Sequence, residues 1–178
     1  SDVCSSDHMA EMHPVLFSRM LANRKSKGDV KIIDFATRTT RTSQASDRSI
    51  LFKPQTDLAV ANAICYEIIR NDWVNWDFVN KHVSFHKGKT NIGYGTEDHF
   101  KFKDKAETVD FEQYKEFLAD YTPENVEKIS GVSSKDIKYL ASLFGNPDKK
   151  VVSYWCMGMN QHTRGTWINN LVYNCHLL

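Results

Sequence analysis

The segment from Val151 to Leu178 constrains the fold of this chain most strongly. Its apolar run Val151–Trp155 predicts a short strand, and the polar, glycine-containing residues Met157–Thr163 predict a turn. Apolar residues then recur at helical spacing up to the last residue. A strand, a turn and a helix in this order are typical of α/β domains, in which the helix N-terminus presents unpaired N–H groups to a ligand.

Further short strands and helices precede this segment. Apolar runs at Val30–Phe35 and Ser49–Phe52 predict two buried strands, and the polar residues Ser84–Val109 predict a long surface excursion. We therefore predict an α/β fold with a mostly parallel sheet flanked by helices. Apolar periodicity and capping residues predict helices within residues 8–25, 58–69, 75–83 and 111–121, and others that begin at 123 and 133.

Composition narrows the class of protein. With 41% hydrophobic and 25% charged residues the chain is typical of globular proteins, and no apolar run is long enough to insert into a membrane. A net charge of +1 gives no global attraction for nucleic acid. The four cysteines show no C-x-x-C spacing, so they predict neither a zinc nor an iron–sulfur site. We expect Cys65 and Cys175 to be buried free thiols on helices.

Three polar turns fall where the carboxyl ends of parallel strands should lie, at residues 36–48, 53–57 and 156–164. They contain hydroxyls, arginines and helix N-termini that suit phosphates, and Asp57 suits a ribose or a guanine edge. This pattern favours a nucleotide ligand, although neither G-x-G-x-x-G nor a P-loop is present. The alternative is that the turns are merely solvated and that Thr56 or Asp57 only caps a helix.

The two ends of the sequence suggest a piece of a longer protein. Residues 1–7 are small and polar where a core strand should precede the first helix, so we expect a foreign or scrambled leader there. The apolar helix that ends at Leu178 has no stop signal after it. We therefore expect residues 8–178 to be a partial α/β domain, truncated at both ends.

Five segments resemble the molybdopterin oxidoreductase family, and within it the catalytic subunits of periplasmic nitrate reductases. The resemblance runs in order along nearly the whole chain from His8. The turn MGMNQHTRGTW is its most specific part. The segments are MAEMHPVL (Met9–Leu16), FKPQTDLA (Phe52–Ala59), VNWDFVNKHV (Val74–Val83), NIGYGTEDHFKFKD (Asn91–Asp104) and the final Val151–Leu178.

The resemblance implies a multi-domain fold of the formate dehydrogenase and DMSO reductase kind. It implies molybdenum on two molybdopterin guanine dinucleotides, a [4Fe–4S] cluster, and reduction of nitrate to nitrite by oxygen-atom transfer. A c-type cytochrome subunit as electron donor and a periplasmic location are also implied. The cysteine that ligates molybdenum and those that hold the cluster lie upstream in such proteins, so we expect no catalytic or metal-ligating residue in this chain.

The resemblance also implies which residues contact the cofactor. They lie in the turn before the first helix, the loop after the first strand, the cap of the second long helix and the final turn. By number they are His8, Met9, Ala10, Glu11 and Met12; Ala36, Thr37, Arg38, Thr39 and Thr40; Gln55, Thr56 and Asp57; and Met157 and Gln161.

Two alternatives remain open at this point. Another oxidoreductase of the same family, acting on formate or a different oxyanion, shares the fold and a looser form of these turns. A stand-alone α/β nucleotide-binding module without a redox role would need only the polar turns. As part of a nitrate reductase, this stretch alone is expected to be inactive.

Overall fold

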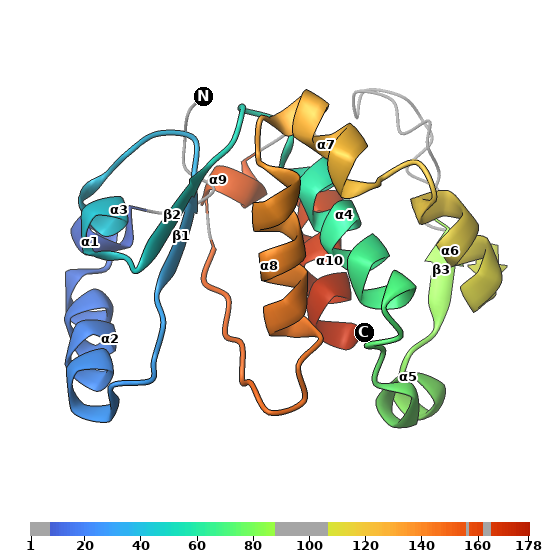
Figure 1. Ribbon diagram of the computed structural model, residues 1–178, viewed down its shortest axis with the longest axis horizontal. Helices are drawn as coiled ribbons and strands as arrows, with labels where there is room; N and C mark the ends of the chain where they lie inside the picture. The colour runs from blue at the N-terminus through green and yellow to red at the C-terminus, as the bar shows by residue number, and fades with distance from the viewer. Residues whose placement is uncertain (1–7, 88–106, 156, 162–164) are drawn as a thin grey trace, which may run out of the picture.

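The computed structural model describes residues 8–87, 107–155, 157–161 and 165–178. Figure 1 shows α1, α2, α3, β1 and β2 on the left, α4, α7, α8 and α10 in the centre, and α5, α6 and β3 on the right. In chain order the elements are α1 (Met9–Met12), α2 (Pro14–Lys27), β1 (Ile33–Ala36), α3 (Arg41–Ala45), β2 (Arg48–Leu51), α4 (Asp57–Arg70), α5 (Trp76–His82), β3 (Phe85–Lys87), β4 (Glu107–Val109), α6 (Phe111–Leu118), α7 (Pro123–Ser130), α8 (Ser134–Phe144), α9 (Met157–Asn160) and α10 (Gly165–Leu177).

Strands β1 and β2 form a parallel pair, with Ala36 opposite Leu51 at its end. The ring of Phe35 in β1 stacks on that of Phe52, which directly follows β2, with the centroids 4.2 Å apart. This stacking stabilises the pairing of the two strands. Parallel strands end at the same edge of a sheet, and the loops that follow β1 and β2 therefore start side by side. The predicted α/β class is confirmed, with a small parallel sheet and a large share of helix.

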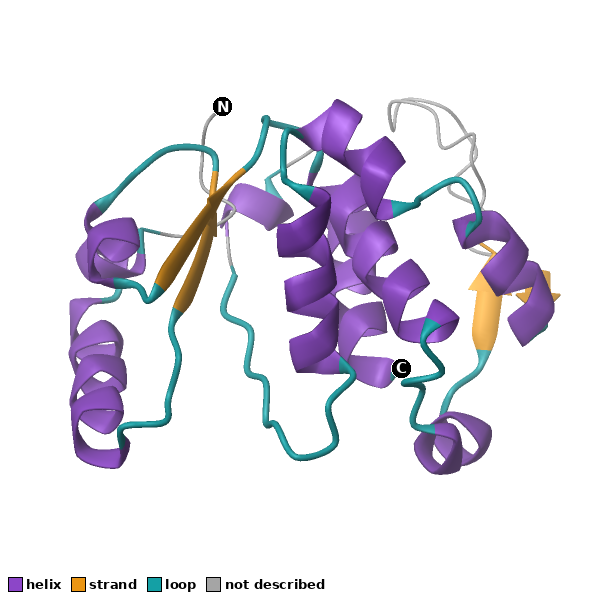
Figure 2. Ribbon diagram, viewed as in Figure 1, coloured by secondary structure: helices purple, strands orange, loops and turns teal. Residues whose placement is uncertain are grey.

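Helix α4 forms the centre of the hydrophobic core, because α6, α7, α8 and α10 all contact it. A helix covered on several sides needs apolar residues around most of its circumference. The sequence of α4, DLAVANAICYEIIR, meets this need. Figure 2 shows the surrounding helices as the main mass of the structure. The most deeply buried residues of α4 are Val60, Ala63, Cys65 and Ile68, each at most 1% exposed.

Helix α7 connects this core to the loop after β2. It begins where the hydroxyl of Thr122 accepts a hydrogen bond from the Asn125 N–H, and it ends at Gly131, whose φ of 75° favours glycine. The carbonyl of Ser130 accepts the N–H of Lys53 at 2.8 Å. The end of α7 therefore fixes the start of the loop that contains residues 53–57.

The strand predicted at Val151–Trp155 is not present, which corrects the sequence analysis. These residues form a loop that rises from α8 to α9 (Figure 2). Val152 is 69% and Tyr154 50% exposed, whereas Ser153 contacts the His176 ring with its hydroxyl 2.8 Å from Nε2. A strand needs a neighbour for its N–H and C=O groups, and the described strands pair only as β1–β2 and β3–β4.

Three local features differ from the predicted pattern. Pro14 disfavours a helical His13 and so divides the first helical segment into α1 and α2. The polar loop 36–48 contains the short helix α3, and the predicted surface excursion 84–109 is bounded by the antiparallel pair β3–β4. Residues 88–106 of that excursion, which include the whole family-like NIGYGTEDHFKFKD segment, lie outside the described residues.

In the part of the chain that the structure describes, no helix is long and apolar enough to cross a bilayer.

Candidate functional site

The first two predicted contact segments lie together. The Arg38 guanidinium donates to His8 Nε2 over 3.0 Å, and the Ala10 N–H donates to the Thr42 hydroxyl over 3.0 Å. His8 has a left-handed backbone with φ 38°, which starts α1 directly beside α3. Residues about thirty positions apart in sequence are therefore joined by side-chain contacts, as a shared ligand site requires.

The other members of the first segment differ in exposure. Met9 is buried at 9% exposure, whereas Met12 is 67% exposed. Glu11 pairs with Arg41 over 3.6 Å on the surface, where such a pair contributes little to stability. Arg41 is 78% exposed in its side chain, so it remains accessible to an anion.

The loop after β1 contains a buried hydroxyl without a protein partner. Thr37 Oγ1 is shielded from solvent and makes no hydrogen bond to another described residue. Before it, Ala36 is 1% exposed, and after it, Arg38 and Thr39 are exposed. A buried hydroxyl normally has a hydrogen-bond partner, so a ligand is a reasonable partner for this one.

The end of this loop is held by a network that the sequence analysis missed. Thr40 is the N-cap of α3, and its side chain accepts the Ser43 N–H over 3.3 Å. The Ser43 hydroxyl donates to Asp34 Oδ2 over 2.5 Å. Asp34 is only 3% exposed, and its Oδ1 has no partner among the described residues. The spacing Thr-x-x-Ser is the signal that predicts such a capped turn.

The Gln-Thr-Asp segment turns sharply into α4. Gln55 is exposed with φ 66°, a left-handed conformation that costs a non-glycine residue free energy. Thr56 occupies the N-cap position, but its hydroxyl donates to the Lys53 carbonyl over 2.6 Å instead of capping the helix. Asp57, 5% exposed, accepts the Leu58 N–H over 2.9 Å. The Thr56 side chain therefore makes no capping hydrogen bond at the start of α4.

The final turn forms the one-turn helix α9, and hydrogen bonds of one side chain connect the residues on either side of it. The Gln161 N–H donates to the Met157 carbonyl over 2.9 Å, Met157 is 47% exposed, and Gln161 is exposed. The Asn169 amide accepts the Trp155 indole N–H over 2.5 Å and donates to the Gly165 carbonyl over 2.7 Å. One side chain of α10 thus connects the residues before and after the turn.

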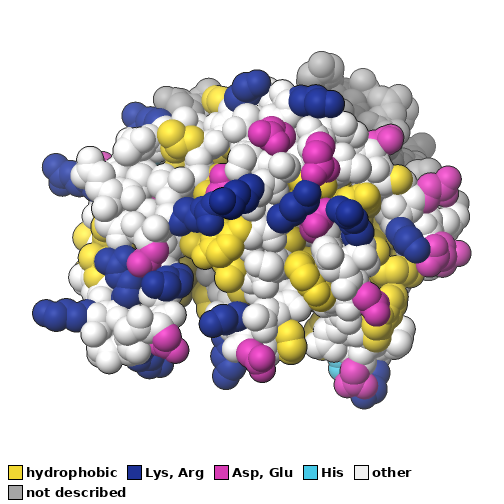
Figure 3. Space-filling view, in the orientation of Figure 1, with side chains coloured by type: hydrophobic (Ala, Val, Ile, Leu, Met, Phe, Trp, Pro, Cys, Tyr) yellow, Lys and Arg dark blue, Asp and Glu magenta, His cyan; other side chains and the backbone are white. Residues whose placement is uncertain are grey.

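Three of the predicted contact segments begin near the same end of the structure. Figure 1 shows the ends of β1 and β2, the start of α4 and helix α9 all in the upper part of the view. Figure 3, in the same orientation, shows basic and acidic side chains interspersed on the face turned toward the viewer, with apolar side chains exposed between them. Anion binding here would therefore depend on local groups such as Arg38, not on a broad positive field.

The carboxylate of Asp47 holds the residues just before β1 in place. The Ile32 N–H donates to Asp47 over 2.8 Å, and this bond is the main reason that the pKa of Asp47 is lowered. Arg24 adds a hydrogen bond of 3.1 Å that lowers the pKa of Asp47 further. The carboxylate therefore fastens α2 to the start of β1.

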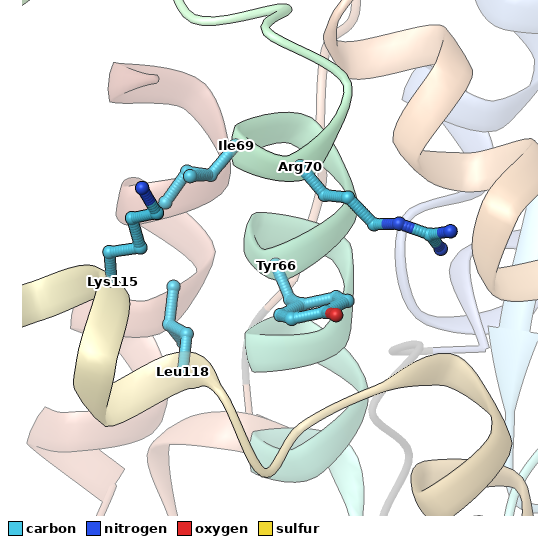
Figure 4. A pocket seen from close by; sticks show the side chains of 5 residues that line it. All are labelled: Tyr66, Ile69, Arg70, Lys115 and Leu118. Carbon is cyan, nitrogen blue, oxygen red and sulfur yellow. The ribbon is translucent and has the colours of Figure 1, made fainter.

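A separate pocket of about 320 Å³ lies between α4 and α6. Figure 4 shows Tyr66, Ile69 and Leu118 along it, with Arg70 and Lys115 at its sides. Both cations have acidic partners on their own helices, Glu67 at 3.1 Å and Glu112 at 3.5 Å. None of the predicted cofactor contacts lines this pocket, so we do not assign it to the site.

Within the described ranges, no three side chains of His, Cys, Asp or Glu are arranged to hold a metal ion. The prediction that the ligands of molybdenum and of the cluster lie upstream remains a prediction. Cys65 and Cys175 are buried and reduced, as the sequence analysis predicted.

Comparison with known proteins identifies the class. The chain matches the molybdopterin oxidoreductase family over residues 4–178, and it belongs to that family. Its fold is similar to that of acetylene hydratase from Pelobacter acetylenicus, with a TM-score of 0.60 and 18% sequence identity. The match covers 91% of this chain and 18% of the hydratase, so the chain spans under a fifth of the length of that protein.

The described residues fit a molybdopterin cofactor, which membership of the family implies. The Thr37 hydroxyl, which has no hydrogen-bond partner among the described residues, belongs to the residue before Arg38 in the chain, and His8 contacts the Arg38 guanidinium. A hydroxyl, an arginine and an imidazole are suitable partners for the phosphate oxygens of the cofactor. This local chemistry is the basis on which we assign His8, Thr37 and Arg38 to one cofactor-binding region below.

Proposed function

We propose that this chain supplies part of the cofactor-binding region of a nitrate reductase that uses molybdenum on two molybdopterin guanine dinucleotides. The observation that carries the proposal is the contact of Arg38 with His8, together with the buried hydroxyl of the preceding residue, Thr37, which has no hydrogen-bond partner among the described residues. It joins two segments that the resemblance independently identified as cofactor contacts. Family membership supports the molybdopterin part of the proposal.

Each segment has a distinct role in this proposal. Arg38 and His8 bind a phosphate of one dinucleotide, and Thr37 donates its hydroxyl to the same ligand. Gln55, Thr56 and Asp57 hold the guanine or ribose end at the start of α4, where the Thr56 side chain makes no capping hydrogen bond. Met157 and Gln161 contact the part of the cofactor nearer the metal. The remaining residues of the predicted set contribute backbone groups and packing.

When bound, the cofactor supplies the redox chemistry by which nitrate loses an oxygen atom and becomes nitrite. The chain's residues bind and orient it, and none of them is proposed as a catalytic or metal-ligating group. The MGMNQHTRGTW turn supports nitrate over other substrates, because it is the most specific part of the resemblance. The [4Fe–4S] cluster, a c-type cytochrome donor and a periplasmic location are further proposals that rest on the same resemblance.

Activity of the longer protein that contains this chain tests the substrate. Purified from its source organism and assayed without oxygen, it should oxidise a reduced viologen dye when nitrate is added and release nitrite in equal amount. Formate and acetylene are tested in parallel, because related proteins act on such molecules. Turnover of formate or acetylene with no nitrate-dependent oxidation would refute nitrate as the substrate while leaving the cofactor assignment intact.

The stretch of 178 residues tested alone should show no nitrate-dependent dye oxidation, since the proposed metal ligands lie elsewhere. Nitrate-dependent oxidation by this stretch alone would contradict that part of the proposal. The alternative of a stand-alone nucleotide-binding module predicts instead that the isolated stretch binds guanosine diphosphate, with no molybdenum in the longer protein.

A further inference from the structure

Two buried thiols face each other between the central helix and the last helix. Cys65 lies on α4 and is 0% exposed, and Cys175 lies on α10 and is 6% exposed. Their sulfur atoms are 3.6 Å apart, and the residues are separated by 110 positions in the sequence. We propose that Cys65 and Cys175 form a disulfide that joins α4 covalently to α10 when the chain folds in the presence of a disulfide oxidant.

The geometry permits the bond with a small adjustment. A disulfide has its sulfur atoms about 2.05 Å apart, so the two atoms must approach by roughly 1.5 Å. Helices α4 and α10 already contact each other, so the side chains can close most of this gap by rotation about their Cα–Cβ bonds. Cys175 also donates to the Ala61 carbonyl, with 3.6 Å between sulfur and oxygen. A thiol is a weak donor, so losing this bond on rotation would cost little.

The surroundings determine when the bond can form. The hydrogen bond with Cys65 and burial both raise the pKa of the Cys175 thiol. Tyr114 of α6 lies against the pair, and burial raises the pKa of its hydroxyl as well, so the phenol stays neutral beside the two sulfur atoms. Because the thiolate is the nucleophile in exchange, oxidation should be slow in the folded chain and faster before α10 is in place.

The chemistry is a balanced exchange with a small disulfide such as oxidised glutathione. One cysteine thiolate attacks the oxidant and forms a mixed disulfide, releasing one glutathione thiolate. The second cysteine thiolate then attacks the protein sulfur of that mixed disulfide and releases the other glutathione. The protein sulfurs lose two electrons in total, the oxidant gains them, and the two cysteine protons pass to the two released thiolates.

The test uses the 178-residue chain with Cys4→Ser and Cys156→Ser, which leaves one pair of thiols. The reduced chain is unfolded and then refolded in a mixture of reduced and oxidised glutathione. Remaining thiols are labelled with a maleimide under denaturing conditions, and linked peptides are identified by mass spectrometry. We expect both thiols to be lost, no glutathione to be attached, and the peptides of Cys65 and Cys175 to be linked.

A matched control and a second measurement keep the result decisive. In the variant that also has Cys65→Ser, Cys175 should carry glutathione or stay free, and no linked peptides should form. Mass spectrometry detects this outcome whether or not the variant folds. The linked chain should also unfold at a higher denaturant concentration than the reduced chain, because a long closed loop restricts the unfolded state. Two free thiols, or glutathione on each cysteine, after oxidative refolding would overturn the proposal.

Discussion

Replacing Gly165 with alanine should destabilise the final turn and helix α10. A Cβ atom at Gly165 would lie 2.3 Å from the Asn160 carbonyl oxygen and 2.9 Å from its carbonyl carbon. A carbon and an oxygen atom in contact are normally more than 3 Å apart, so the backbone at the end of α9 must move by roughly 1 Å. The glycine is needed for this close approach of α9 to the start of α10.

The size of the effect follows from two opposing contributions. Alanine favours a helix over glycine by about 1 kcal/mol in a helix interior, and by less at the first position of α10. Forcing an extra methyl group into a packed site costs about 1–3 kcal/mol, here against backbone atoms that cannot rotate away. We expect the loss of unfolding free energy to be about 1–2 kcal/mol.

Urea unfolding followed by circular dichroism measures this loss. With a slope of about 2 kcal/mol per M, the midpoint should fall by roughly 0.5–1 M. Asn170→Ala is the matched control, because Asn170 is exposed on the same helix and alanine there should leave the midpoint unchanged or raise it slightly. An unchanged or higher midpoint for Gly165→Ala would show that the close approach does not exist.

Three further predictions concern the site and its support. Asp47→Asn should lower stability above about pH 5, and its difference from the original chain should shrink as the pH falls below about 4, because the lowered pKa of Asp47 stabilises the fold only while the carboxylate is charged; unfolding at several pH values measures this. Thr37→Val should change the unfolding free energy by less than about 0.5 kcal/mol, since the hydroxyl has no partner among the described residues, yet it should lower the cofactor content of the longer protein. In that protein Met157→Ala should reduce nitrate turnover per molybdenum more than Asp57→Asn, and equal molybdenum loss in both with normal turnover per molybdenum would contradict the placement.

The sequence predicted the fold class and most helices because their signals are local. Apolar periodicity located α4 and α6, and Thr122-Pro123 located the start of α7. The prediction of a strand at Val151–Trp155 was wrong, because an apolar run indicates only that its residues tend to avoid water. It does not indicate that a neighbouring strand is present to pair with them.

The sequence predicted which segments form the candidate site, but not which of their residues contact one another. Sequence reasoning alone grouped the loop after β1 with the start of α4 and the final turn, and the resemblance added the turn at His8. No sequence pattern indicates that Arg38 reaches His8 or that Asp34 binds Ser43, because those contacts depend on how α1 and α3 are arranged around β1. The sequence also could not show that the Thr56 hydroxyl donates to the Lys53 carbonyl instead of accepting an N–H of α4, since Thr56 occupies the N-cap position.

Cofactor content of the longer protein tests the central claim most directly. Molybdenum is measured by elemental analysis, and guanosine monophosphate is measured after acid release from the cofactor. The account predicts both in the unaltered protein, at two guanosine monophosphates per molybdenum, and a loss of both with Arg38→Ala. Arg19→Ala, on the exposed surface of α2, should change neither. Full molybdenum and guanosine monophosphate in the Arg38→Ala protein, or none in the unaltered protein, would contradict it.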